Sequence, residues 1–349
     1  MNISAKPWNR SNPPKRILAI RLQAMGDMVI SLPYIQYLRR TLPKETIIDF
    51  LTLEEVKSIP KSIDLFDHVY KIGGGRRFKL QFLYTCLLLP KFKFKKYDVV
   101  LDLQNNLLSN MIRKAVNPEA WCEFDRYSPN PAGERNRATI EAVGLGKVEA
   151  SGGFIIKQKN DIDKLLKENG WDENKDLIIL NPAGAFENRH WPAEHFIAFA
   201  KLWLEQYPSS QFLALGIDKI AEKAILFKDA LGDRLINLVN KTTPAQAFAI
   251  IQRTKFVLSE DSGMMHMAWV SGIPTFAIFG STRSDWTQPL GKHTSFLDSS
   301  DMECGNCMLE VCRFSDERMN LCMLRYKPNF IFEKAKALME KVKQYQLNS

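Results

Sequence analysis

The sequence of 349 residues lacks a long apolar run, and its longest, Leu80–Pro90, covers 11 residues with cations on both sides. A transmembrane helix needs about 18 or more apolar residues, so a membrane span is excluded. The first 15 residues also lack the apolar core of a signal peptide. Six cysteines are too few for a disulfide scaffold in a chain of this size. We therefore expect a soluble, cytoplasmic protein, for which contact with a membrane surface stays open.

Neither acidic nor disorder-promoting composition dominates the chain. Hydrophobic residues make up 45% and charged residues 25%, which excludes disordered, collagen-like and coiled-coil proteins. The net charge of +9 lies wholly in residues 1–150, with 24 Lys and Arg against 15 Asp and Glu, whereas residues 151–349 are neutral. The length suggests about two domains. The charge pattern suggests that they meet different partners, one of them anionic; a solvated basic surface without a partner is the alternative.

Short apolar segments alternate with helical patterns along the chain. Arg16–Leu22 is followed by a turn at Gly26 and by apolar residues at helical spacing up to Pro43, which is the start of a βα unit. Six further segments are predicted strands: Thr46–Leu51, Val99–Leu103, Leu177–Asn181, Gln211–Gly216, Phe256–Ser259 and Thr275–Phe279. The alternation predicts an α/β fold with mainly parallel sheets. Ser151–Asn174 is the predicted boundary region, and Phe330–Tyr345 is a predicted Lys-rich amphipathic helix that can cross back to the first domain.

The first candidate site is Arg21–Asp27, between the first predicted strand and helix. Ligands of open α/β sheets bind at the carboxyl ends of strands. Asp27 is expected at a helix N-terminus, where an ionised carboxylate is favoured and can accept a proton from a hydroxyl. Simple capping of the helix is the alternative. With Gly26 as the only glycine, the turn is not a GxGxxG motif, so a nicotinamide-dinucleotide site is not expected.

Two further turns in the second half could bind an anion. In Asn181–Pro192, small residues such as Gly184 and Ala185 let the backbone approach a ligand, and Arg189 adds a cation suited to phosphate. His190 and Trp191 are interpreted as packing residues. The other turn follows the strand Phe256–Ser259 and opens a helix, which places backbone N–H groups at a helix N-terminus; its candidate residues are Asp261, Ser262, Gly263 and His266. Capping is again the alternative, but two such turns in one domain favour a diphosphate.

Lys71–Lys96 holds eight cations and no carboxylate, with aromatic residues between them. Basic and aromatic residues around a short apolar run are typical of an interfacial membrane contact. The segment has no recognised nucleic-acid fold around it, so no nucleic-acid partner is expected. The predicted membrane-facing residues are Arg76, Arg77, Lys91, Lys93 and Lys95.

Four cysteines near the C-terminus have the spacing C-x2-C-x4-C-x9-C: Cys304, Cys307, Cys312 and Cys322. Thiolates can hold zinc, but this spacing matches no common zinc module. Reduced thiols in a long loop are therefore the expectation, with no metal and no cofactor.

Together these segments resemble glycosyltransferase family 9, the lipopolysaccharide heptosyltransferases. The matching stretches, in the family's order, are Arg16–Pro33, Tyr97–Arg113, Glu134–Asn136, Arg189–Pro192 and Ser259–Gly280. The resemblance implies a GT-B architecture, in which two Rossmann-like domains flank a cleft. It also implies an inverting, metal-independent transfer from a nucleotide-diphosphate sugar. We predict an acceptor-binding domain at 1–160, a nucleotide-sugar-binding domain at 161–328, and a C-terminal helix at 329–349 that packs back toward the first domain.

The resemblance also assigns roles to residues. Asp27 matches the family's catalytic base, Arg189 stands where the family commonly has Lys, and Glu222 aligns loosely with an acidic residue that holds the donor ribose. The D-[TS]-G-x-x-H turn that binds the donor diphosphate is matched by Asp261, Ser262, Gly263 and His266. Gly184 and Ala185 replace a Thr-Thr pair that is common in the family. The predicted acceptor contacts are Arg21, Gln104 and Arg113.

The resulting hypothesis is transfer of heptose from ADP-heptose to a lipopolysaccharide inner-core or lipid-linked acceptor at the inner membrane surface. The alternatives are a family member that uses another nucleotide sugar or acceptor, and a non-catalytic protein that binds anionic membranes or nucleic acid.

Overall fold

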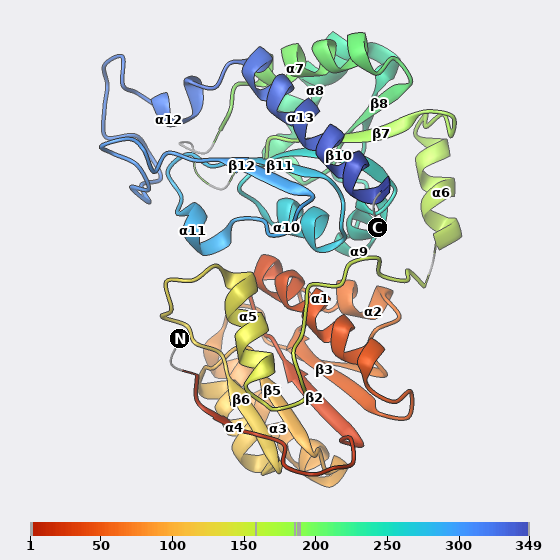
Figure 1. Ribbon diagram of the computed structural model, residues 1–349, viewed down its shortest axis with the longest axis vertical. Coiled ribbons are helices and arrows are strands. Elements are labelled where there is room, and N and C mark those ends of the chain that lie inside the picture. Colours follow the sequence, from red (N-terminus) through yellow and green to blue (C-terminus); the bar gives the residue numbers. More distant parts are fainter. Residues whose placement is uncertain (1–2, 158, 185, 187–189, 348–349) are drawn as a thin grey trace. The chain divides into compact units, whose positions relative to one another are not determined.

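The computed structural model describes residues 3–157, 159–184, 186 and 190–347. The chain divides into two compact units, Met1–Lys157 and Gln158–Ser349 (Figure 1). This division lies three residues from the one expected at 160/161. Each unit contains one six-stranded sheet with helices packed on it. Arg189 and Ala185, two of the predicted donor contacts, lie outside the described residues.

The first unit is built on a sheet with the strand order β1-β6-β5-β2-β3-β4. All neighbouring strands are parallel except β1, which is antiparallel to β6. The strands are β1 (Ala5–Lys6), β2 (Arg16–Ile20), β3 (Ile47–Leu53), β4 (His68–Ile72), β5 (Val99–Asp102) and β6 (Ala120–Glu123). The central strands are apolar and buried on both faces, as parallel sheets covered by helices require. The strand order reverses between β2 and β5.

The helices of the first unit form two packed groups. They are α1 (Met25–Thr41), α2 (Ser58–Ser62), α3 (Phe78–Lys95), α4 (Leu107–Val116) and α5 (Ala132–Glu141). α1 packs against α5, and α3 packs against α4. α1 ends just before Pro43, since the residue preceding a proline disfavours helical backbone. α4 begins at a reciprocal cap in which Asn106 and Ser109 each accept a hydrogen bond from the other's backbone N–H.

The second unit contains an all-parallel sheet with the order β12-β11-β10-β7-β8-β9. Its strands are β7 (Asp176–Asn181), β8 (Ser210–Ala214), β9 (Leu235–Asn237), β10 (Thr254–Glu260), β11 (Thr275–Ile278) and β12 (Thr294–Leu297). Read outward from β7 on both sides, this is the doubly wound Rossmann order, with its reversal between β7 and β10. The α/β architecture with two Rossmann-like sheets is confirmed.

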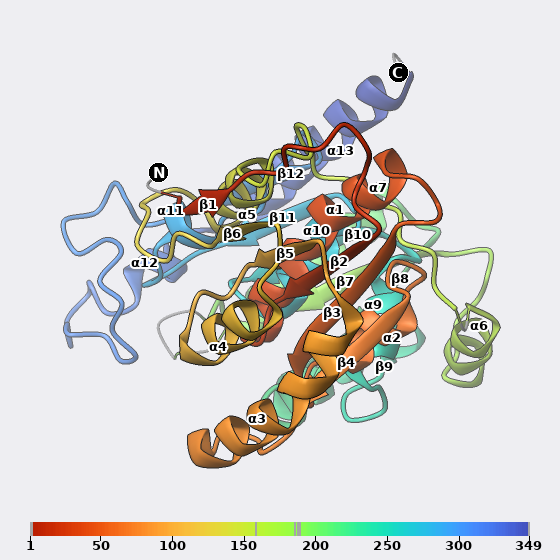
Figure 2. The ribbon, with the colours of Figure 1, turned by 90° about the horizontal axis from the view of Figure 1, so that it is seen from below.

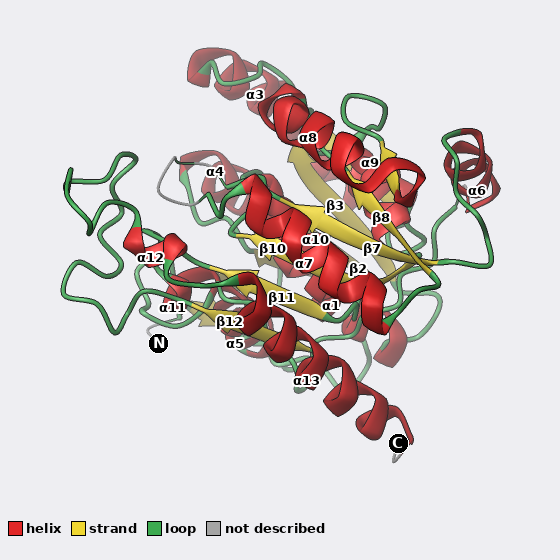
Figure 3. Cartoon of the chain, turned by 90° about the horizontal axis from the view of Figure 1, so that it is seen from above, coloured by secondary structure: helices red, strands yellow, loops and turns green. Residues whose placement is uncertain are grey.

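The helices of the second unit are α6 (Lys159–Glu168), α7 (Ala193–Gln206), η2 (Asp218–Ile220), α8 (Ala221–Leu231), η3 (Gly232–Arg234), α9 (Pro244–Ile251), α10 (Gly263–Val270), α11 (Ser284–Thr287), α12 (Leu321–Leu324) and α13 (Pro328–Leu347). α13 packs on α7 and also contacts β12, both in its own unit (Figure 3). The predicted return of this helix to the first domain stays a prediction.

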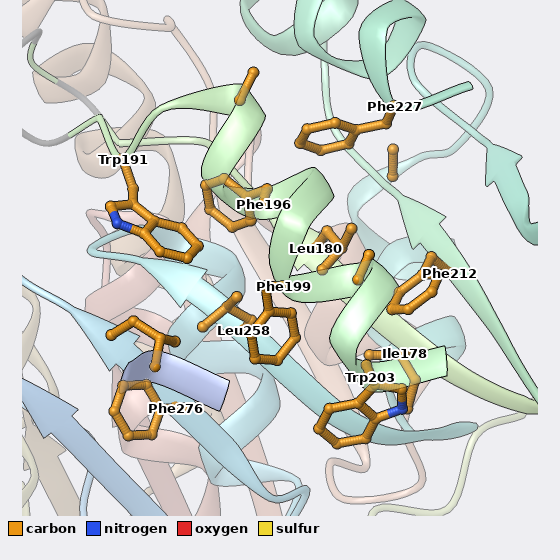
Figure 4. Close-up of a cluster of buried hydrophobic side chains, with 14 of the residues drawn as sticks. Ile178, Leu180, Trp191, Phe196, Phe199, Trp203, Phe212, Phe227, Leu258 and Phe276 are labelled. Atoms are coloured by element: carbon orange, nitrogen blue, oxygen red, sulfur yellow. The ribbon is translucent and has the colours of Figure 1, made fainter. Parts of the chain in front are cut away.

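An aromatic core lies between α7 and the sheet of the second unit. Phe196, Phe199 and Trp203 on α7 recur at helical spacing and are buried against strand residues (Figure 4). Phe199 stacks near Phe256, and Trp203 stacks on the same ring at a centroid distance of 4.8 Å. Trp191, just before α7, is fully buried and donates its indole N–H to the carbonyl of Tyr326 at 2.8 Å. The interpretation of Trp191 as a packing residue is therefore confirmed.

All seven predicted strands are present, and the five that sequence reasoning missed lie at or next to sheet edges. β1 and β4 form the edges of the first sheet, and β9 and β12 those of the second. β6 lies next to β1. An edge strand is covered on fewer sides and needs fewer apolar residues, so its hydrophobic pattern is weak. The four residues of β12, for example, are all only partly buried.

Candidate active site

The predicted site segments follow the strands that border the reversal point of each sheet. Arg21–Asp27 follows β2, and Gln104 follows β5. In the second unit, Gly184 follows β7 and Asp261 follows β10. The crevice at such a point, at the carboxyl ends of the strands, is where open α/β sheets bind ligands. The topology thus brings the candidates of each unit to its natural ligand edge.

Asp27 and Arg21 form an ion pair at the start of α1. Nη2 of Arg21 lies 3.1 Å from Oδ1 of Asp27. The other carboxylate oxygen accepts a hydrogen bond from the backbone N–H of Ala24 at 3.2 Å. Asp27 is the third residue of α1, and its side chain is 38% exposed. The carboxylate is therefore held in one orientation and is still accessible to a hydroxyl group.

Arg21 is itself fixed by buried contacts. Its side chain donates a hydrogen bond to the carbonyl of Leu103 and lies over the ring of Phe124, with 4.7 Å to the ring centroid. Burial lowers the pKa of Arg21, although Asp27 and Asp102 act in the opposite direction. An arginine stays charged in proteins, so Arg21 is a fixed cation next to Asp27.

A pocket of about 370 Å³ surrounds this pair, and among the residues that the structure describes Asp27 is the only carboxylate that lines it. The lining residues are Arg21, Gln23, Ala24, Asp27, Gln104, Phe124, Arg126 and Arg135. Three arginines around one carboxylate favour an anionic ligand. Arg135 is half-buried, and its guanidinium lies 5.2 Å from the centroid of Phe124, on the same ring as Arg21.

The three predicted acceptor contacts have different surroundings. Arg21 and Gln104 line the pocket, and Oε1 of Gln104 accepts hydrogen bonds from the backbone N–H groups of Leu22 and Gln23. Arg113 is not among the lining residues. Its guanidinium is bonded to Glu123 and lies 4.1 Å from the ring centroid of Trp121.

Asp102 at the end of β5 shapes the loop beside the pocket. Its Oδ1 accepts hydrogen bonds from the backbone N–H groups of Gln104 and Asn105, at 3.1 and 2.7 Å. Burial raises the pKa of Asp102 to about 6, against the lowering effect of these bonds. Asp102 thus holds Gln104 in place for its contact with the turn before α1.

In the second unit, the ends of β7 and β10 are tied together at the start of α10. Nδ2 of Asn181 donates to the hydroxyls of Ser259 and Ser262, both at 2.7 Å. Ser262 caps α10 by accepting from the backbone N–H of Met265, and Gly263 is the first helical residue. A helix N-terminus with a glycine opening lets an anion approach the backbone N–H groups.

His266 and Asp261 are buried beside this helix start. Nδ1 of His266 accepts a hydrogen bond from the indole of Trp269 at 3.1 Å. A neutral imidazole that accepts at Nδ1 carries its proton on Nε2, which can then donate. Glu222 lies in the first turn of α8 and is exposed, after the strand β8.

Glu260 holds both ends of the turn that contains the predicted donor residues. Its Oε2 accepts from the backbone N–H of Gly184 at 2.7 Å, and its Oε1 accepts from that of Trp191 at 2.5 Å. The side chain is fully buried, and burial raises its pKa to about 7. Nζ of Lys223 donates to the carbonyl of Pro182 in the same turn. Gly184 and Trp191 are therefore both fastened to Glu260 at the end of β10.

Comparison with known proteins identifies the chain's family. The sequence model of glycosyltransferase family 9 (heptosyltransferase) matches residues 88–317, about two thirds of the chain. The chain belongs to glycosyltransferase family 9. The resemblance carried by the sequence motifs is therefore confirmed, and the chain is a glycosyltransferase of the heptosyltransferase family.

Two relatives of this family 9 chain illustrate the similarity. Lipooligosaccharide heptosyltransferase 2 of Campylobacter jejuni serotype O:2 is 30% identical over 194 residues, 54% of this chain and 56% of that protein. The chain thus spans little more than half the length of this relative. Lipopolysaccharide heptosyltransferase 1 of Pseudomonas aeruginosa is 22% identical over 356 aligned positions, which cover 93% of this chain and 98% of that protein.

Solved structures share the fold of the family 9 chain. A family 9 glycosyltransferase from Veillonella parvula has a TM-score of 0.75 at 17% identity and covers 94% of this chain and 97% of its own. ADP-heptose LPS heptosyltransferase II of Escherichia coli has a TM-score of 0.70 at 18% identity, over 94% and 99%. E. coli heptosyltransferase WaaC, solved with ADP-2-deoxy-2-fluoro heptose, has a TM-score of 0.65 at 16% identity, over 92% and 99%. The GT-B-like heptosyltransferase fold is confirmed.

Sequence reasoning about the family 9 chain missed three features of the site. Arg126 and Arg135 line the pocket but were not predicted as contacts, although Arg135 stands in the matching stretch Glu134–Asn136. Glu260 lies directly before Asp261 in another matching stretch. Arg135 and Glu260 are charged residues inside family motifs, and this was the signal that could have identified them, whereas Arg126 lies outside the matching stretches and had no such signal.

The four C-terminal cysteines of the family 9 chain line one cavity of about 20 Å³. Burial, together with the three neighbouring thiols, raises the pKa of Cys322 to about 11. Across residues 3–157, 159–184, 186 and 190–347, no group of three or more His, Cys, Asp or Glu side chains is arranged to hold a metal ion. None of the described cysteines is in a disulfide.

Proposed function

We propose that the chain is an inverting heptosyltransferase that moves heptose from ADP-heptose to a lipopolysaccharide inner-core or lipid-linked acceptor. The Asp27 carboxylate, held by buried Arg21 in a basic pocket of a family 9 chain, carries this proposal. The names of the Campylobacter and Pseudomonas relatives support the sugar and the acceptor class. The E. coli structure with an ADP-heptose analogue supports the donor class.

In the proposed reaction, Asp27 accepts the proton of an acceptor hydroxyl. The hydroxyl oxygen attacks the anomeric carbon of the donor from the face opposite the diphosphate and forms the new glycosidic bond. The bond from the anomeric carbon to the diphosphate oxygen breaks, and its electron pair leaves with the nucleotide. Arg21 acts as a positioning residue because it fixes the carboxylate that accepts the proton. A single displacement of this kind inverts the anomeric configuration.

The second unit is the proposed donor site. The N-terminus of α10, at Ser262 and Gly263, would stabilise the negative charge that develops on the diphosphate. Asp261, His266 and Glu222 are the other described residues of the proposed donor set, and Gly184 lies in the turn fastened by Glu260. Arg189 and Ala185 remain in the proposal from the sequence resemblance.

The first unit is the proposed acceptor site. Arg126 and Arg135 line the pocket and supply positive charge for an anionic acceptor, and Asp27 is the one acidic residue among the described residues of the lining. Arg21 and Gln104 remain in the proposed acceptor set, together with Arg113. We also propose that transfer takes place at the inner face of the cytoplasmic membrane, where a lipid-linked acceptor is presented.

Binding and transfer measurements test the function together. We expect ADP-heptose to raise the Tm more than ADP-glucose, GDP- or UDP-sugars, because a ligand that binds the folded state stabilises it. Incubation with ADP-heptose and an inner-core acceptor should then give a product whose new bond has the anomeric configuration opposite to the donor's, as read by NMR.

The same screen separates the alternatives. If transfer occurs only from another nucleotide sugar, the donor is not ADP-heptose. This outcome is tested because Gly184 and Ala185 replace the Thr-Thr pair that is common in the family. Absence of any stabilising nucleotide diphosphate and of any transfer would overturn the enzymatic proposal.

A further inference from the structure

The helix α3 presents an apolar face to solvent. Leu83, Leu87, Pro90 and Phe94 are spaced by four, three and four residues, so they share one side of the helix. Leu83, Leu87 and Phe94 are 53%, 67% and 83% exposed. We call these four residues the outer face of α3. The helix's two buried residues, Thr85 and Phe92, lie on the opposite side.

This arrangement differs from the usual distribution of apolar and polar residues on a surface helix. A helix on a protein in water carries its apolar stripe toward the core and its polar residues outward. On α3, apolar residues occupy both the inner and the outer side, and the aromatic residues Phe78, Phe82 and Tyr84 in its first turns are exposed as well. Clusters of exposed apolar residues with a polar rim mark interaction sites.

Cations surround the outer face of α3. Arg76 and Arg77 precede the helix, and Lys79 and Lys93 are exposed on it. None of these four forms an ion pair with a residue that the structure describes. No carboxylate occurs between Lys71 and Lys96. The charges of these four cations are therefore available to an anionic partner.

Two of the predicted membrane-facing lysines are instead engaged with the sheet. Nζ of Lys95 lies 3.7 Å from the carboxylate of Asp49 and 5.3 Å from the ring centroid of Tyr70. Nζ of Lys91 lies 4.7 Å from the same centroid. Both side chains turn toward β3 and β4, so the charges left for a partner are chiefly those of Arg76, Arg77, Lys79 and Lys93.

We propose that the outer face of α3 and its cationic rim dock onto the surface of an anionic lipid bilayer. The apolar side chains would enter the boundary between headgroups and acyl chains, and the four cations would contact lipid phosphates, which is how amphipathic helices bind in the plane of a membrane. Among the described residues, no helix is long and apolar enough to cross a bilayer. Exposed aromatic and basic residues also occur on RNA-binding surfaces, so RNA binding is the alternative outcome of the test below.

The position of α3 suits this role. It follows β4, the edge strand of the first sheet, and packs on α4 and β4 at the periphery of the unit (Figure 2). Because β4 is parallel to β2 and β5, α3 begins at the sheet edge that also carries the pocket of Asp27. The docking proposal deepens the proposed function, since it would keep this edge close to a lipid-linked acceptor.

Vesicle co-sedimentation tests the docking. The full chain should bind vesicles of phosphatidylcholine with phosphatidylglycerol and bind pure phosphatidylcholine vesicles at least tenfold more weakly, with the difference reduced by salt. The double variant Leu87→Gln/Phe94→Gln should lower the partition coefficient roughly tenfold or more. Lys93→Glu should lower it about tenfold or more on anionic vesicles only, because a positive contact becomes a repulsive one.

Matched controls come from the second unit. Ile225→Gln replaces an exposed apolar residue, 56% exposed on α8, and Lys201→Glu reverses an exposed lysine on α7; both should leave vesicle binding unchanged. Thermal unfolding should show that every variant is folded, since all the altered side chains are exposed.

The outcomes separate docking from catalysis. On a water-soluble, lipid-free acceptor, the α3 variants should retain wild-type turnover. Equal binding of wild type and α3 variants to anionic vesicles would overturn the docking proposal, as would tight RNA binding without vesicle binding. If the wild-type chain transfers no sugar to the soluble acceptor yet binds vesicles through α3, the proposed function fails while the docking proposal stands.

Discussion

The guanidinium of Arg21 lies 3.1 Å from the carboxylate of Asp27, and its hydrogen bond to the carbonyl of Leu103 holds it there. Asp27 follows Arg21 by six positions in the chain, and the turn between β2 and α1 folds the two against each other. A half-exposed carboxylate fixed by a buried cation has one orientation toward a ligand in the pocket. This relationship yields the first two predictions.

Replacing Asp27 by Ala or Asn should lower kcat about 10²–10⁴-fold, the usual contribution of a general base. The Kd for the donor nucleotide should stay at the wild-type value, because Asp27 lies outside the proposed donor site. Steady-state kinetics and calorimetric titration measure the two quantities. Asp64→Asn, which changes an exposed carboxylate of the same unit, is the control and should behave as wild type. Normal turnover of folded Asp27→Ala would show that another group accepts the proton.

Arg21→Lys keeps the charge but loses the planar guanidinium that reaches Leu103 and Asp27 together. We expect kcat to fall about 10- to 100-fold, since small misplacements of a catalytic group are costly. The KM values for donor and acceptor should change little, which distinguishes lost positioning from lost binding. Arg39→Lys is the control, because Arg39 pairs with Asp67 away from the pocket. A raised acceptor KM with unchanged kcat would instead make Arg21 a binding residue.

The double variant Arg126→Gln/Arg135→Gln should raise the KM for an anionic acceptor at least tenfold, because hydrogen bonds to charged groups contribute about 1.5–3 kcal/mol each. Donor affinity should be unaffected. Arg137→Gln provides a control on the same helix as Arg135, since Arg137 is held by Glu134 and Glu141 and does not line the pocket. An unchanged acceptor KM in the double variant would remove both arginines from the acceptor site.

The buried carboxyl of Glu260 should make folding stability depend on pH. Its pKa is about 7 in the folded chain, above the ordinary value of 4.5 for a glutamate, so the folded state binds this proton more tightly. The stabilisation is complete below about pH 4.5 and is lost as the pH rises through 7. Asp102, with a pKa of about 6, contributes in the same direction at lower pH. The interval from pH 6 to 8 therefore reports mainly on Glu260.

Urea unfolding at several pH values measures this dependence. Glu260→Gln should show a flatter profile of unfolding free energy between pH 6 and 8 than the wild type, because its side chain does not titrate. The decrease that disappears is at most about 1.4 kcal/mol per pH unit, the limit for one proton. Glu205→Gln, an exposed glutamate of α7, should retain the wild-type slope. Identical slopes in wild type and Glu260→Gln would mean that Glu260 stays ionised throughout.

The aromatic core of the second unit predicts a contrast in stability. Trp203→Ala removes a 2% exposed side chain that stacks on Phe256, and it should cost about 3–5 kcal/mol in unfolding free energy. Phe94→Ala removes an 83% exposed ring from α3 and should change stability by less than about 0.5 kcal/mol. Urea titrations measure both. A large loss from Phe94→Ala would show that its ring packs inside the folded chain.

Much of this architecture could be predicted from the sequence because the central strands are continuous apolar runs. A strand buried on both faces needs a run of apolar residues, and β2, β5, β7 and β10 each contain one. The turns after these strands were also predictable, because glycine, serine and aspartate at a strand-to-helix junction indicate a helix start or an anion site. The family motifs also predicted that Asp27 and the turn at Asp261 lie at such junctions.

Contacts between segments that are distant in the chain could not be predicted in this way. Arg113 carries the charge expected of an acceptor contact, but Glu123 and Trp121 occupy its guanidinium. Arg126 and Arg135 enter the pocket because the loop after β6 and the start of α5 fold over the end of β2. The local sequence does not determine which distant residue a long side chain contacts in the folded protein.

The sequence by itself determined the α/β class, the order of the central strands along the chain, the family, and the absence of acidic residues from Lys71 to Lys96. These follow from local composition and spacing. Only the tertiary structure decided which charges remain available: Lys91 and Lys95 turn to Tyr70 and Asp49, whereas Lys93 and the apolar side chains of Leu87 and Phe94 face solvent. The physical reason is that the free energy of a charge or an apolar group depends on what lies next to it, and packing sets those neighbours.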